Sequence, residues 1–257
     1  MTGRAAAPGG TMGLGDHLRE LRNRLIFALV GIGLGAIGGW FLYDPVVAFM
    51  SAPLKEITDT NAQMNFETIS AALDLKLRVS ISLGVLVSSP WWIYQVAAFI
   101  GPGLKRKEKL MAGAFGLAGF VLFAAGAVTG VWVAPRAVSI LVSFVPSDAA
   151  ALVSGVSYIN FYTYLVIAFG LSFLVPELLV AASFMGVVKS RTLVRAWRVA
   201  VVVAFAFAAV INPIPNPLPM IIQALGMLGL YYLAVLIAFM HERNVARRTR
   251  ETLAAAD

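Results

Sequence analysis

Long apolar runs separated by short charged segments make up most of this chain. Six runs are candidate membrane spans: Leu25–Tyr43, Val79–Ile100, Leu110–Val133, Tyr158–Val188, Val199–Ile211 and Met220–Met240. A span needs about 20 apolar residues, and the fifth run has only 13. The pattern predicts an all-α polytopic membrane protein of six transmembrane helices. Helices 5 and 6 are expected to be short and to form a hairpin that indents the bilayer.

The composition supports a membrane protein and excludes several kinds of site. Of the 257 residues, 60% are apolar and 13% charged, whereas soluble domains are about 45–50% apolar and about 25% charged. The chain has no cysteine, which excludes disulfides, thiolate metal sites and iron–sulfur clusters. His17 and His241 lie among charged residues outside the spans, so a haem held by intramembrane histidines is excluded. We expect no cofactor.

The distribution of basic residues predicts the orientation. Four segments contain 16 of the 20 lysines and arginines: the one before the first span, the loops between spans 2 and 3 and between spans 4 and 5, and the C-terminal tail. The positive-inside rule then places both termini in the cytoplasm. It also explains the net charge of +7 without a nucleic-acid partner. We expect a flexible N-terminal tail over 1–15, a membrane domain over 16–240 and a basic cytoplasmic tail over 241–257.

The stretch "DHLRELRNRL", residues 16–25, is a dense charge cluster directly before the first span. On a helix, Glu20 can reach Arg24 at i,i+4 in the favourable order, which describes a membrane anchor with internal ion pairs. A topology signal needs only the positive charges, however. Glu20, together with Glu108 on the same side, is therefore also available to a cationic ligand such as a guanidinium. His17 and Glu20 resemble half of a metal site, but no further histidines complete it.

Glu177 is the one carboxylate inside an apolar run. It lies roughly 16 Å along the helix axis from the cytoplasmic end of its span. An ionisable group at that depth is a functional candidate, for proton handling or for contact with a polar partner in the membrane. The structural alternative is that Pro176 opens the helix and Glu177 satisfies the freed backbone groups.

Small residues and prolines indicate how the spans pack. Glycines recur every four residues at positions 31, 35 and 39, and again at 126 and 130. Such faces allow a second helix to approach closely. Pro90 and Pro176 should kink spans 2 and 4.

Several motifs in order along the chain resemble the TatC family, the multispanning subunit of the twin-arginine protein translocase. They are "HLRELRNRL" before the first span, "SAPL" after it, "YQVAAFIGPGLKRKEK" at the end of the second span and "FGLSFLVPELLV" in the fourth. The resemblance covers about residues 14–240. It implies six helices in a concave, glove-like arrangement and no enzymatic activity.

The resemblance also implies a function and a set of site residues. The chain would recognise twin-arginine signal peptides of folded proteins exported across the bacterial cytoplasmic membrane, driven by the proton motive force. Its partners would be single-span TatA-type and TatB-type subunits and membrane lipid, with self-association in a larger complex. The implied signal-peptide site consists of Glu20, Glu108, Arg22, Arg24, Phe99, Pro102 and Leu104. Pro53 matches a family position in the outer loop.

Two positions depart from the family pattern. Many relatives have the fourth-span glutamate at the position of Leu174, whereas here the acid follows three residues later, at Glu177. The outer turn between spans 5 and 6 often has an aspartate where this chain has Asn216. A rival hypothesis is a proton-coupled small-molecule transporter that works through Glu177. The single intramembrane carboxylate and the incomplete fifth span both argue against it.

Overall fold

The computed structural model describes residues 14–57, 70–100, 106–144, 154–184, 190–212 and 217–254. Within these ranges the chain forms eight α-helices. They are α1 (Leu14–Ile57), α2 (Ala71–Val87), α3 (Ser89–Ile100), α4 (Arg106–Val142), α5 (Gly155–Phe184), α6 (Ser190–Arg195), α7 (Trp197–Ile211) and α8 (Pro217–Ala254).

The described helices contain the predicted apolar runs, the fourth of them as far as Phe184. Among the described helices, α1, α4, α5 and α8 are long and apolar enough to cross a membrane, and α7 is a shorter apolar helix of 15 residues. The second predicted span is divided between α2 and α3 at Ser88. Pro90 lacks an N–H, which frees the Leu86 carbonyl, and the Ser89 hydroxyl donates a hydrogen bond to that carbonyl at 2.7 Å. The predicted kink near Pro90 is therefore present as a break between two helices.

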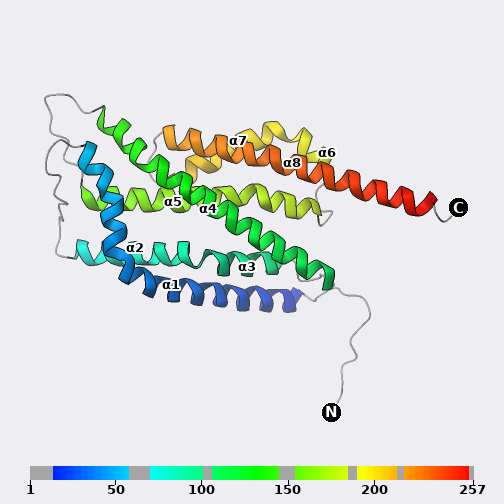
Figure 1. The fold of residues 1–257 in the computed structure, drawn as a ribbon, viewed down its shortest axis with the longest axis horizontal. Helices are drawn as coiled ribbons and strands as arrows, with labels where there is room; N and C mark the ends of the chain where they lie inside the picture. Colours follow the sequence, from blue (N-terminus) through cyan, green and yellow to red (C-terminus); the bar gives the residue numbers. More distant parts are fainter. Residues whose placement is uncertain are drawn as a thin grey trace, which may run out of the picture.

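One expectation about helix length was wrong. The sixth span is not short, because the apolar part of α8, Pro217–Met240, has 24 residues and the helix continues to Ala254. No proline or glycine follows Gly229 to stop it, and the charged end is rich in good helix formers. Pro53 lies in the same helix as the first span, because α1 continues through Pro45 and Pro53 to Ile57. A proline inside a helix removes a backbone hydrogen bond and kinks the helix, and Figure 1 shows α1 bending in its last part rather than ending.

Glycines bring α1 against α2 and α4 against α5, as the repeats predicted. A Cβ added to Gly35 would lie 2.8 Å from the Gly84 carbonyl oxygen, and one added to Gly84 would lie 2.6 Å from the backbone of α1. In the same way, a Cβ on Gly126 would lie 2.5 Å from the Phe169 carbonyl oxygen. Backbones this close leave no room for a side chain, so these glycines set the distances between the helices.

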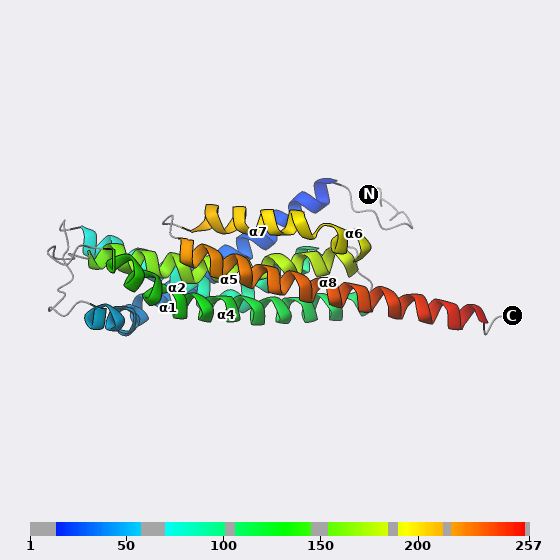
Figure 2. The ribbon, with the colours of Figure 1, turned by 90° about the horizontal axis from the view of Figure 1, so that it is seen from above.

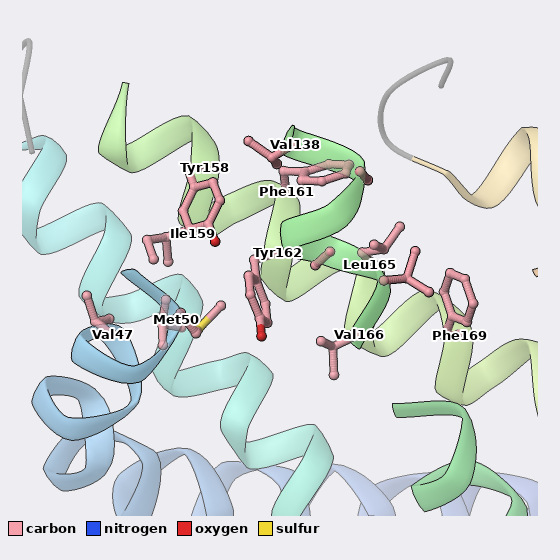
Figure 3. Close-up of a cluster of buried hydrophobic side chains, with 14 of the residues drawn as sticks. Val47, Met50, Val138, Tyr158, Ile159, Phe161, Tyr162, Leu165, Val166 and Phe169 are labelled. Carbon is pink, nitrogen blue, oxygen red and sulfur yellow. The ribbon is translucent and has the colours of Figure 1, made fainter. Parts of the chain in front are cut away.

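A cluster of buried apolar side chains lies where α5 meets α4, α2 and the far part of α1 (Figure 3). Ile159, Leu165 and Phe169 of α5 are completely buried in it. The Tyr162 hydroxyl donates to the Val131 carbonyl of α4 at 3.1 Å, which satisfies a polar group inside this apolar core. α5 is thus the central helix of the bundle.

The arrangement of the helix ends agrees with the predicted division of charge. Figure 1 shows the start of α1, the end of α3, the start of α4 and helix α6 at one end of the bundle. The last part of α8 projects beyond the other helices at this same end (Figure 2). We call it the basic end, because the described parts of the four arginine- and lysine-rich segments lie there.

Candidate functional site

The start of α1 is held against the end of α3 by an aromatic contact. The rings of His17 and Phe99 stack with their centroids 4.6 Å apart and their planes 20° from parallel. Phe99 is half-buried and lies one residue before the end of α3. Because α4 begins six residues after Ile100, the first turns of α1 and α4 and the last turn of α3 meet at the basic end.

Glu20 lies one helical turn after His17 and pairs with Arg24. Arg24 donates to the Glu20 Oε1 atom from Nε at 2.9 Å and from Nη2 at 2.5 Å. The Glu20 side chain is only 21% exposed. Its second oxygen, Oε2, is buried and has no hydrogen-bond partner in the described part of the chain. The internal ion pair considered from sequence is therefore present, and it uses one of the two carboxylate oxygens.

Only some of the other residues expected at this site have side chains that the structure describes. Arg22 is exposed, and its only polar contact in the described part is a 3.5 Å hydrogen bond to Asn23. Glu108 belongs to the first turn of α4, but its side chain lies outside the described residues, as do Pro102, Leu104 and Asn216. The structure thus pairs Glu20 with Arg24 and places Phe99 against His17, one turn before Glu20, and the backbone of Glu108 lies at the same end of the bundle.

Glu177 lines a separate groove between α4, α5 and α8. The groove has a volume of about 320 Å³ and is open at the surface. Apart from Glu177 its lining is apolar and includes Phe115, Leu122, Pro176, Val180, Leu233 and Ile237. Glu177 Oε2 lies against Gly119, where an added Cβ would come within 2.6 Å. Its Oε1 is buried without a partner in the described part, so the lining of the groove includes one carboxylate with an unpartnered oxygen among hydrocarbon side chains.

A buried polar network that the sequence analysis did not single out joins α5, α7 and α8. Gln223 of α8 is completely buried, and its side-chain amide donates to the Ser172 hydroxyl and to the Ala168 carbonyl. Its Oε1 accepts a 2.9 Å hydrogen bond from Nδ2 of Asn212, the residue that caps the end of α7. A glutamine inside the apolar run "PMIIQALGML" was the signal that could have revealed this network.

Comparisons with known proteins agree on one family. Residues 16–225 match the family model described as "Sec-independent protein translocase protein (TatC)". A TatC of the same description from Xylanimonas cellulosilytica is 43% identical over 241 residues, covering 93% of this chain and 87% of its own length. The chloroplastic TATC of Arabidopsis thaliana is 31% identical, over 84% of this chain and 62% of its own. A crystal structure described as twin arginine translocase receptor TatC superposes with a TM-score of 0.73 at 26% identity, over 87% of this chain and 98% of the other.

Proposed function

This chain belongs to the TatC family and is a receptor subunit of the twin-arginine translocase rather than an enzyme, and from that premise we propose that Glu20 is a carboxylate that binds the signal arginines. Glu108, Arg22, Arg24, Phe99, Pro102 and Leu104 complete the proposed site. The observation that carries the proposal is the Glu20 carboxylate, which is mostly buried, held in place by Arg24 and left with one unpartnered oxygen. This oxygen can accept a second guanidinium.

The geometry favours arginine over lysine as the ligand. A guanidinium offers several coplanar N–H donors that match a carboxylate and stays charged when partly desolvated, whereas an ammonium is a compact and strongly hydrated charge. Since Oε2 is buried, the incoming guanidinium replaces the side chains that cover it and enters a partly desolvated setting. Charge-assisted hydrogen bonds are stronger there than at an exposed surface.

The proposal is tested by peptide binding to the purified chain in detergent or nanodiscs. Glu20→Gln is expected to weaken binding of a twin-arginine signal peptide at least about tenfold, since a charged hydrogen bond contributes about 1.5–3 kcal/mol. Binding of the twin-lysine version should change much less. Asp74→Asn is the matched control, because Asp74 forms an equivalent i,i+4 pair with Arg78 outside the proposed site. Equal losses for both peptides, or an equal effect of Asp74→Asn, would contradict the assignment.

We further propose that the Glu177 groove receives an apolar helix of a single-span TatA-type or TatB-type partner. An open apolar groove in the membrane with one unsatisfied carboxylate suits a helix that presents a hydrogen-bond donor at the same depth. The shift of the acid from position 174 to 177 would move the contact by roughly one helical turn. Family membership sets aside the small-molecule transporter hypothesis for the same residue.

The remaining details of the assembly are proposals of the same kind. We infer that the basic end faces the bacterial cytoplasm, with both termini inside, six spans in a concave arrangement and transport driven by the proton motive force. The positive-inside rule supports this orientation. Pro53 and Asn216 would then belong to the opposite, outer side. Cysteine accessibility at each end in sealed vesicles would test the orientation, and labelling of the basic end from outside would contradict it.

A further inference from the structure

Three arginines form a single exposed stripe where α6 passes into α7. Arg191, Arg195 and Arg198 follow the i, i+4, i+7 spacing of one helical face, and all three are exposed. The i, i+4, i+7 spacing of the arginines is kept across the short break between α6 and α7. The Ala196 amide donates to the Thr192 carbonyl at 3.0 Å and the Ala200 amide donates to the Ala196 carbonyl at 2.9 Å, so the helical register continues across it.

The opposite face of the same segment is buried in the protein. Leu193 is 5% exposed, and Ala204 and Ala208 are 4% and 0% exposed. The Tyr231 hydroxyl of α8 donates a buried 2.5 Å hydrogen bond to the Leu193 carbonyl, which fixes α6 to α8. The arginine stripe is therefore presented on a fixed support and points away from the bundle.

Exposed hydrocarbon continues the line of the arginines along α7. Val202, the next position on the stripe, is 68% exposed, and Ala209, on the same face near the end of the helix, is also exposed. Trp197, beside Arg198, is 47% exposed, and the Arg198 guanidinium carbon lies 5.4 Å from its ring centroid. Tryptophan and arginine side by side are typical of the membrane–water interface. The face thus changes from cationic to apolar in the order of a phospholipid headgroup and its acyl chain.

No acid of the described part neutralises these arginines. The ion pairs there join Arg24 to Glu20 and Arg78 to Asp74. We propose that the α6–α7 stripe is a binding site for an anionic phospholipid, with the headgroup phosphate on Arg191, Arg195 and Arg198 and an acyl chain along the Val202 face. Guanidinium groups bind phosphate through paired N–H donors. A topology signal requires only positive charge in the loop, and it does not require the charges to line up over an exposed apolar stripe.

Native mass spectrometry of the full chain tests the proposal. The chain is released from micelles that contain equal amounts of phosphatidylglycerol and phosphatidylcholine with identical acyl chains. We expect the wild type to retain phosphatidylglycerol preferentially. Replacing Arg191, Arg195 and Arg198 together by Gln should reduce this preference by about tenfold or more, as expected for the loss of three surface charges near anionic headgroups.

Two further variants make the result specific. Lys76, Arg78 and Arg136 carry the same number of charges outside the stripe, where Lys76 lies over the Trp40 ring, Arg78 pairs with Asp74 and Arg136 lies over the Trp132 ring. Their replacement by Gln should change the preference less than about threefold, because other side chains of the protein already engage these cations. Replacing the three arginines of the stripe by Lys keeps every charge, so it preserves a pure topology role but should lower phosphatidylglycerol retention.

Equal retention of both lipids by the wild type, or equal losses from the two Gln variants, would overturn the proposal. So would tighter binding of an acidic peptide that phosphatidylglycerol does not displace, since that result indicates a protein partner.

Discussion

Arg24 donates two N–H groups to one carboxylate oxygen of Glu20 and leaves the other oxygen without a partner. Arg24 thus holds the carboxylate through Oε1 and leaves Oε2 for the signal arginine that we propose to bind at Glu20. Arg24→Gln removes this support. We expect it to lower the affinity for a twin-arginine peptide by up to about fivefold, the factor that corresponds to a partly exposed ion pair of about 1 kcal/mol. Isothermal titration calorimetry of the purified chain measures the change.

Arg22→Gln is the control for the general effect of a lost positive charge. Arg22 makes no ion pair in the described part of the chain and is exposed. Its replacement should therefore change the affinity less than that of Arg24. Tighter peptide binding by Arg24→Gln would show that Arg24 competes with the signal arginine for the carboxylate, and it would contradict the positioning role.

The stacking of His17 on Phe99 should increase the affinity for the signal peptide, because it fixes the position of the first turn of α1. Phe99→Ala removes the ring that holds the first turn of α1 against α3. An aromatic pair contributes about 0.5–1.5 kcal/mol beyond its buried area, so we expect a loss of about twofold to tenfold in twin-arginine affinity. His17→Phe keeps an aromatic ring and should retain wild-type affinity, whereas His17→Ala should behave like Phe99→Ala. A loss in His17→Phe as large as in His17→Ala would indicate a role for the imidazole other than stacking.

The sequence predicted the helices well and their ends less well. Apolar runs and glycine spacing are local signals, and they correctly predicted the long apolar helices and the close approach of a second helix at Gly35. The predicted length of α8 was wrong because a charged segment after a span is compatible with a loop and with a helix. The sequence also did not show that the residues around Pro53 continue α1 without a break. Such ambiguities are resolved by tertiary packing, which periodicity does not contain.

The candidate site was predictable only in part for a similar reason. The i,i+4 spacing of Glu20 and Arg24 made their ion pair foreseeable. The stacking of His17 on Phe99 joins residues 82 positions apart, and nothing in their local sequence indicates that α1 and α3 meet there. The Gln223 network likewise depends on the packing of three helices, although a glutamine in an apolar run was a visible signal.

The glycine contact between α1 and α2 makes a prediction about stability. Gly84→Ala would place a Cβ 2.6 Å from the Ala36 amide and from the Ile32 carbonyl, both of which are backbone atoms. The helices must separate, and overpacking of this kind costs about 1–3 kcal/mol. We expect a lower thermal unfolding temperature in detergent. Gly33→Ala and Gly38→Ala are matched controls, because nothing lies within 4 Å of a Cβ at either position. They should match the wild type or exceed it slightly, since alanine favours the helix.

The Glu177 groove predicts where a partner helix is captured. The chain has no cysteine, so a single introduced cysteine reports on one position without background. Phe115 and Leu233 line the groove. A cysteine introduced at either position should form a disulfide with a cysteine in the apolar span of a TatA-type or TatB-type subunit in membranes. Val128→Cys is the control, because Val128 is 68% exposed on α4 but does not line the groove. Equal crosslinking at all three positions would indicate random collisions. Adding Glu177→Ala should reduce crosslinking at the two groove positions.

The hydrogen bond between Asn212 and Gln223 predicts an energetic coupling between α7 and α8. Gln223→Ala removes one of the two hydrogen bonds of Asn212 Nδ2, which keeps its bond to the Ala208 carbonyl, and one of the two donors to the Ala168 carbonyl, which still accepts from Ser172. Asn212→Ala leaves the buried Gln223 Oε1 unpaired, and an unsatisfied buried polar group costs about 1–3 kcal/mol. If the two residues act as a pair, the double variant is less destabilised than the sum of the single variants, by about 0.5–3 kcal/mol. Thermal or denaturant unfolding in micelles measures this difference, with Thr129→Ala as a control whose hydroxyl bonds only within its own helix. Additive effects would show that α7 is held to α8 by apolar packing alone, and the short helix would then depend on Ala204 and Ala208 for its position.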